Sequence, residues 1–231
     1  MLYERWRRKV MFGAGGLLLA AALWATPSTQ IWNPSTDTQG AGSVHLGIDD
    51  YFTVSGVSEG GYQFATDIGL TYGLLPGFEV GADVFLPQTN PVVFNAKYGL
   101  PETDALPAVA VGGFGFGTKK DVTDQNVIYG VVAKTLPIIG RLSAGYFVGN
   151  EKLLTSPSGN KDNGGMILTW DKMITDKLWL CVDYAGSQSA LGATFYGFSW
   201  TFAANASAIF SYGTFNNGNK PVITTQVDIN L

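Results

Sequence analysis

From residue 43 onward, apolar and polar side chains alternate with a period of two along short segments. Such alternation is typical of β-strands with one apolar face, because successive side chains of a strand point to opposite sides. Clusters of Gly, Pro, Asn or Asp separate the segments and indicate turns. The pattern predicts no amphipathic helix and twelve strands, at residues 43–54, 62–75, 78–86, 92–100, 106–117, 126–136, 141–150, 164–174, 177–187, 190–202, 206–215 and 221–231.

The connections between these segments alternate in length. The longer ones are 55–61, 87–91, 118–125, 151–163 and 216–220, and the shorter ones are 76–77, 137–140, 175–176 and 203–205. Only 101–105, which is longer than the alternation requires, and 188–189, which is shorter, break the rule. Barrels of bacterial outer membranes have short turns on the periplasmic side and longer loops outside. With an even number of strands, both ends of the predicted barrel then lie on the periplasmic side.

Two architectures satisfy this alternation. In a secreted soluble β domain the large apolar side chains point inward, whereas in a membrane barrel they face lipid and the polar side chains line a lumen. Charged residues make up only 14% of the chain, against roughly 25% in typical soluble domains. Twelve strands also enclose more space than side chains alone fill, since about eight strands are just filled. Composition and strand number favour the transmembrane antiparallel up-and-down β-barrel, with the soluble domain as a weaker alternative.

The first 25 residues differ from the rest. A basic stretch with Arg5, Arg7, Arg8 and Lys9 precedes an uncharged apolar run, Val10 to Trp24, which is too short to span hydrocarbon as a helix. This arrangement predicts a signal peptide at 1–25 and export. Without it the chain keeps 10 basic and 17 acidic residues, a net charge of −7, which argues against a nucleic-acid partner.

Residues 26–42 form a polar, turn-rich lead-in before the barrel at 43–231. We expect this lead-in on the periplasmic side. It is also able to fold into the barrel, with Trp32 as its packing anchor.

The alternation assigns side chains to the two faces. Charged and polar candidates for the lumen, which would set ion selectivity, are His45, Asp49, Asp67, Glu79, Asp83, Lys97, Lys134, Arg141, Asp171, Lys177, Asp183 and Asp228. Candidates for the lipid-facing surface and its aromatic girdles are Tyr72, Phe78, Phe94, Tyr98, Tyr146, Trp170, Tyr184, Phe198, Trp200 and Phe202. Aromatic residues near segment ends, also read as girdle residues, are Tyr51, Phe52, Tyr62, Phe85, Phe114, Phe116, Trp170, Tyr184 and Phe215.

Two stretches carry a resemblance to a known class. "YGLLPGFEVGADV" (72–84) is similar to the hairpins of bacterial outer-membrane β-barrels of the porin or transporter-like type. "VITTQVDINL" (222–231) resembles the C-terminal strand that the outer-membrane assembly machinery recognises, with Val227, Ile229 and Leu231 at its apolar positions, although it ends in Leu rather than the usual Phe. The resemblance covers residues 43–231, implies an outer-membrane location, and names no substrate.

Catalytic and metal chemistry finds little support in the sequence. Cys181 is the single cysteine, which excludes a disulfide framework and a cysteine metal cluster and leaves a packing role. His45 is the single histidine and falls on the predicted lumen face, and neither G-x-S-x-G nor H-E-x-x-H occurs. We therefore expect no enzyme, no metal and no cofactor.

The function that the sequence predicts is a porin-like channel for passive passage of small solutes, with a weak cation preference from the acidic bias of the lumen. The alternative is a structural barrel with a blocked lumen that docks a periplasmic or surface partner. Expected partners are membrane lipid, lipopolysaccharide through the loop residues Lys119 and Lys120, the assembly machinery and the solutes themselves. A homo-oligomer is compatible with this pattern.

Overall fold

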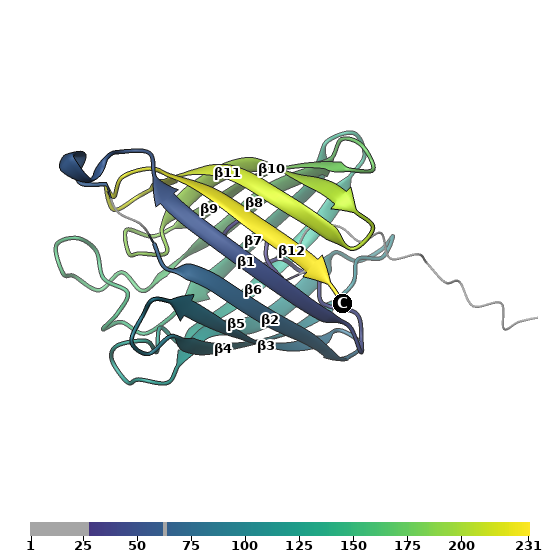
Figure 1. The fold of residues 1–231 in the computed structure, drawn as a ribbon. Coiled ribbons are helices and arrows are strands. Elements are labelled where there is room, and N and C mark those ends of the chain that lie inside the picture. Colours follow the sequence, from purple (N-terminus) through teal and green to yellow (C-terminus); the bar gives the residue numbers. More distant parts are fainter. Residues whose placement is uncertain (1–27, 62–63) are drawn as a thin grey trace, which may run out of the picture.

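A computed structural model describes residues 28–61 and 64–231 and shows a closed, antiparallel barrel of twelve strands (Figure 1). Each strand pairs with its neighbours in sequence, and the last strand pairs with the first to close the barrel. The strands are β1 (Val44–Thr53), β2 (Thr66–Leu75), β3 (Phe78–Leu86), β4 (Val92–Leu100), β5 (Ala108–Gly117), β6 (Val127–Leu136), β7 (Gly140–Val148), β8 (Gly164–Met173), β9 (Leu178–Gly186), β10 (Ala193–Ala203), β11 (Ala206–Phe215) and β12 (Val222–Asn230). The predicted fold class and strand count are confirmed.

The two ends of the barrel differ in the way that the sequence predicts. One end carries the connections 54–65, 87–91, 118–126, 149–163, 187–192 and 216–221, and is called the long-loop end below. The other carries 76–77, 101–107, 137–139, 174–177 and 204–205, together with the C-terminus, and is called the short-turn end (Figure 1). The connection 101–107 is longer than the others at this end. It is ordered by a hydrogen bond from the backbone N–H of Thr103 to the carbonyl of Leu106.

The outside of the barrel is apolar because each strand directs its large hydrophobic side chains outward. All ten side chains assigned to the lipid-facing surface lie on this side, and eight of them, including Tyr146 and Phe202, are exposed. Leucine, valine and isoleucine side chains such as Leu168 and Val182 fill the space between the aromatic rings. A mainly apolar exterior around a closed barrel is typical of a protein whose solvent is lipid.

At the C-terminus, Val227 and Ile229 of β12 also face outward, and the backbone N–H of Leu231 donates to the carbonyl of Val44 at 2.8 Å. The described helical structure is the single turn η1 (Val57–Glu59). Within residues 28–61 and 64–231, no helix is both long and apolar enough to cross a membrane. The predicted signal peptide and Tyr62 lie outside the described residues.

Residues 28–40, called the inserted segment below, lie inside the barrel, so the predicted lead-in folds into the lumen. The chain turns into the lumen just before β1, where Gly42 and Gly73 are joined by a backbone hydrogen bond of 2.7 Å. It runs inward to a tip at Ile31–Asn33 and returns, with an antiparallel bridge between Thr29 and Pro34. Ile31 and Asn33 are buried, so part of the lumen is filled by the protein's own chain.

Candidate functional site: a partly filled lumen

Ten of the twelve charged or polar residues assigned to the lumen lie on the inward side of their strands. Six of them are almost fully buried: His45, Glu79, Lys97, Asp171, Asp183 and Asp228. The other four, which are Asp49, Asp67, Asp83 and Arg141, are partly exposed. The period of two therefore places charged groups from eight of the strands around one interior.

Lys134 and Lys177 are corrections to that assignment. Lys134 pairs with Leu142 across the β6–β7 register and shares the outward side with Val132. Its Nζ lies 2.9 Å from Glu102 in the connection 101–107, and this hydrogen bond lowers the pKa of the Glu102 carboxyl. Lys177 is exposed in the turn before β9 rather than within a strand. Neither lysine lines the lumen.

Several aromatic residues predicted in the girdles face inward instead. Tyr51, Phe85, Phe114 and Phe215 lie on the lumen side near the long-loop ends of their strands. Position near a strand end is therefore not enough to identify a girdle residue. These rings cover part of the inserted segment and the space beside it.

The base of the inserted segment is held by a buried ion pair. The Nζ of Lys97 lies 3.2 Å from Oε1 of Glu79, and each of the two side chains is 2% exposed. Lys97 also donates to the carbonyl of Ser28 at 2.9 Å, and the backbone N–H of Gln39 donates to Glu79 at 2.7 Å. The start and the end of the segment are thus fastened to the same pair.

A second ion pair reaches the segment from β7. Arg141 donates through Nε to Asp171 at 2.8 Å and through a terminal nitrogen to Asp37 of the segment at 2.5 Å. Asp171 also accepts hydrogen bonds from Gln30 of the segment and from the indole of Trp179. Charge-assisted hydrogen bonds of this kind are roughly twice as strong as neutral ones.

At the tip of the segment, one buried carboxylate binds its backbone. Asp183 accepts the N–H groups of Trp32 and Asn33, both at 2.8 Å, and the side-chain amide of Asn33 at 2.6 Å. Thr169 donates a fourth hydrogen bond to it, also at 2.6 Å. The charge of Asp183 is therefore balanced by four donors rather than by a cation.

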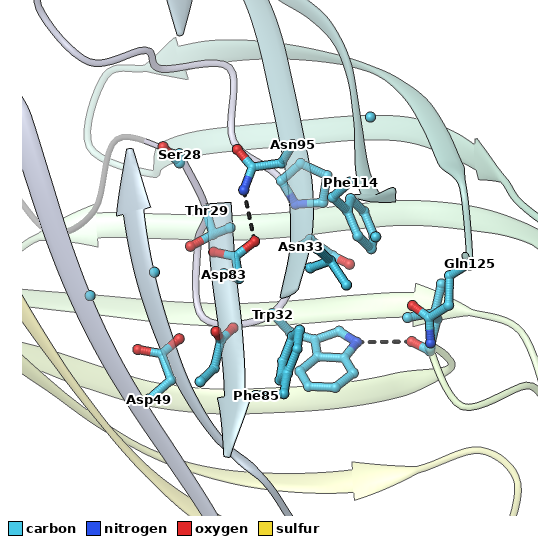
Figure 2. Close-up of a pocket in the computed structure, with 18 of the residues that line it drawn as sticks. Ser28, Thr29, Trp32, Asn33, Asp49, Asp83, Phe85, Asn95, Phe114 and Gln125 are labelled. Atoms are coloured by element: carbon cyan, nitrogen blue, oxygen red, sulfur yellow. Dashed lines mark hydrogen bonds between the residues drawn. The ribbon is translucent and has the colours of Figure 1, made fainter. Parts of the chain in front are cut away.

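The side chain of Trp32 occupies an aromatic socket. It stacks on Phe195 with ring centroids 5.0 Å apart and meets the edges of Tyr51 and Phe215 at 5.7 and 6.0 Å. Its indole N–H donates to the carbonyl of Leu191 in the connection 187–192 (Figure 2). The segment entering from the short-turn end is thus bonded to a connection of the long-loop end.

The lumen that the segment leaves free is a cavity of about 600 Å³. It lies beside the segment, is lined mainly by β1 to β5 with single residues of β6 to β9 and β12, and extends to connections of the long-loop end such as Val122–Gln125. Figure 2 shows Ser28, Thr29 and Asn33 of the segment together with Asp49 and Asp83 of the wall. Phe85 and Phe114 line the same space.

Three acidic side chains on neighbouring strands line the cavity. Asp49 of β1 is directly opposite Asp67 of β2, and Asp83 of β3 is opposite Gly69, two residues along β2. Asp83 accepts one hydrogen bond, from Asn95 at 2.8 Å (Figure 2). Among the residues that the structure describes, no basic nitrogen lies within 4.0 Å of these three side chains.

The other inward carboxylates have partners, so the acidic excess is concentrated in the cavity. Glu79 is paired with Lys97, Asp171 with Arg141, and Asp228 with His45 at 3.4 Å. Towards the short-turn end the lumen is packed, because Glu79, Lys97 and His45 of the wall and Thr36 and Gln39 of the segment are each at most 3% exposed. The segment therefore fills much of the lumen towards that end.

Comparison with protein-family models and with curated proteins gives no match. Among solved structures, the KdgM porin aligns with a TM-score of 0.58 and 8% identity, over 80% of this chain and 98% of that one. The KdgM porin in complex with disordered oligogalacturonate gives a TM-score of 0.53 and 8% identity over 81% and 98%. An outer membrane channel from Pseudomonas putida F1 gives 0.49 and 9% over 84% and 97%. At these identities the KdgM likeness shows the barrel fold.

Proposed function

We propose that this protein is a porin-like channel of the bacterial outer membrane, through which small solutes pass along the acidic cavity. The observation that carries the proposal is the segregation of charge in the lumen. Carboxylates with a structural role are bound by a basic side chain or, at Asp183, by four hydrogen-bond donors. Asp49, Asp67 and Asp83 instead converge on open space, and none of the basic groups that the structure describes lies within 4.0 Å of them. The porin fold of the KdgM neighbours supports a channel at the level of architecture.

The charge predicts selectivity for cations. Rings of Asp or Glu attract cations and repel anions, and a lumen bounded by protein and lipid screens this field less than bulk water does. Because the cavity also carries the aromatic rings of Phe85 and Phe114, it tolerates solutes with an apolar part. The proposed channel therefore selects solutes by the sign of their charge and by their size.

Planar-bilayer recording tests this function. The folded barrel is inserted, and the reversal potential is measured in a KCl gradient for the wild type and for the Asp49→Asn/Asp67→Asn/Asp83→Asn variant. We expect a cation-selective reversal potential that moves towards zero in the triple variant. The matched control is Asp50→Asn, which removes an acid of β1 bonded to Thr66 outside the cavity and leaves the potential unchanged. A triple variant as selective as the wild type would refute the assigned path.

The blocked lumen gives a second candidate, a structural barrel that docks a partner. The buried base of the inserted segment favours it, since Glu79 and Lys97 are almost fully covered there. A folded wild-type barrel that shows no current at any voltage, and that co-purifies with one stable partner, would support this candidate over the channel.

A further inference from the structure

We propose that the inserted segment, residues 28–40, is an autoinhibitory gate: it occupies a site built for it in the lumen wall and leaves this site when the channel opens. The inference rests on the proposed channel function. It goes further, because it assigns the closed state to one segment and names the wall residues that hold it.

The wall is shaped to the backbone of the segment. Two inward glycines mark its path, Gly73 of β2 and Gly99 of β4. A Cβ at Gly73 would overlap the carbonyl oxygen of Gly40, and one at Gly99 would lie 2.8 Å from that of Thr36. Gly47 of β1 also faces inward, but a Cβ there would meet nothing closer than 3.8 Å. Gly73 and Gly99 thus leave room for the backbone of the segment, whereas Gly47 does not contact it.

The wall contacts the segment as a peptide-binding site contacts a peptide. Asp183 and Glu79 accept its N–H groups, while Gln226 and Lys97 donate to its carbonyls, at Ile31 and Ser28. The Trp32 side chain fills the aromatic socket as the anchor. Each contact is a hydrogen bond or a ring packing that forms and breaks without rearrangement of the barrel strands.

The segment can leave towards the short-turn end, because the chain joins β1 there. Asp37, which pairs with Arg141, is its most solvent-accessible anchor, with 47% of its side chain exposed. Water and salt reach this ion pair and screen it more than they do the buried anchors, so release begins at Asp37. The tip, held by Asp183 and the aromatic socket, leaves last.

A native cysteine can be used to detect departure of the inserted segment from the lumen. Cys181, the single cysteine, is buried on the inward side of β9 in the same cluster as Ile31 of the segment. A water-soluble thiol reagent reaches it from the lumen only when Ile31 moves away. Its labelling rate in the folded full-length barrel therefore measures departure of the segment, independently of any ion current.

The test uses a seat variant, Gly73→Ala/Gly99→Ala, with Gly47→Ala as the control. We expect several-fold faster labelling of Cys181 and several-fold higher mean conductance in the seat variant, and neither change in the control. Trp32→Ala against the outward control Trp200→Ala repeats the comparison if the seat variant does not fold. A peptide with the sequence of residues 28–40, added at the short-turn side, should lower the conductance of the Trp32→Ala variant, which keeps both glycines of the wall, and the same peptide with Ala for Trp should not.

The outcomes separate the gate from the channel. Unchanged labelling and conductance in folded seat and Trp32→Ala variants would overturn the gate and identify the segment as a fixed part of the core. Faster labelling in a variant that conducts, but no more than the wild type does, would also overturn it, because the segment would then move without controlling passage. Absence of current in every variant, despite faster labelling, would instead refute the channel.

Discussion

Asp183→Asn is the substitution whose effect follows most directly from the geometry of the segment. The carboxylate is 1% exposed and accepts four hydrogen bonds, two at each oxygen. An amide has one accepting oxygen. Suppose that this oxygen still accepts the backbone N–H groups of Trp32 and Asn33. The new NH₂ group then takes the place of the oxygen that accepted from the Asn33 side chain at 2.6 Å, so two NH₂ donors face each other. Thr169 can rotate to accept from it, but Asn33 cannot.

The magnitude follows from the bonds changed. One hydrogen bond to a charged acceptor is lost, which costs about 1.5–3 kcal/mol, and two others weaken because their acceptor becomes neutral. We therefore expect Asp183→Asn to lower the free energy of unfolding by about 2–4 kcal/mol. The matched control is Asp83→Asn, whose oxygen still accepts from Asn95 and whose cost should stay below about 1 kcal/mol.

The assay is equilibrium unfolding in urea of the barrel refolded into lipid vesicles, followed by tryptophan fluorescence and by the heat-dependent shift of the folded band in gels. Both variants and the wild type are compared at the same lipid composition. A loss in Asp183→Asn of less than about 0.5 kcal/mol would refute the reasoning, because that is the usual range for surface substitutions without a structural role.

Three further predictions concern other parts of the barrel. Lys97→Met leaves the Glu79 carboxylate buried without its cation and should cost about 3–5 kcal/mol in the same titration, while Glu79→Gln/Lys97→Met should recover part of the loss; an equal loss in both would contradict the pairing. Leu168→Arg on the outward side of β8 should cost about 2–4 kcal/mol in lipid, and Leu106→Arg in the exposed connection 101–107 much less. Lys134→Ala should cost under about 1 kcal/mol, since the pair with Glu102 is exposed to solvent. Lys134 lowers the pKa of Glu102, so the pair stabilises the protein at pH values above the ordinary carboxyl pKa and loses this effect as the pH falls through the lowered pKa. The free energy of unfolding of the Lys134→Ala variant should therefore change less with pH in this acidic range.

The strands could be predicted because a barrel wall imposes one rule on every residue. Side chains alternate between lipid and lumen, so the observed bounds, for example Phe78–Leu86 and Ala206–Phe215, coincide with the predicted ranges. Alternation failed for Lys134 because β6 is apolar on both sides, with Val127 and Val131 inward and Ile128 and Val132 outward. A strand without a polar face does not reveal which side meets the lumen.

The inserted segment could be proposed but not placed from the sequence. Its residues are polar and follow no period, and the contacts that fix it, such as that of Asn33 with Asp183, span about 150 positions of the chain. The same holds for the inward rings of Phe195 and Phe215, whose partner Trp32 lies far away in sequence. The acidic lining of the cavity could be predicted in part, because Asp49, Asp67 and Asp83 fall on predicted neighbouring strands. The structure was needed to show which of the inward acids have a cation beside them.

The central claim, an acid-lined channel closed by its own N-terminal segment, is tested most directly by the reversal potential and conductance of the seat variant, Gly73→Ala/Gly99→Ala, in a KCl gradient. The account predicts a larger current than that of Gly47→Ala, with a reversal potential that indicates passage of potassium rather than chloride. A folded seat variant that passes no current, or that conducts without preference for potassium, would contradict it.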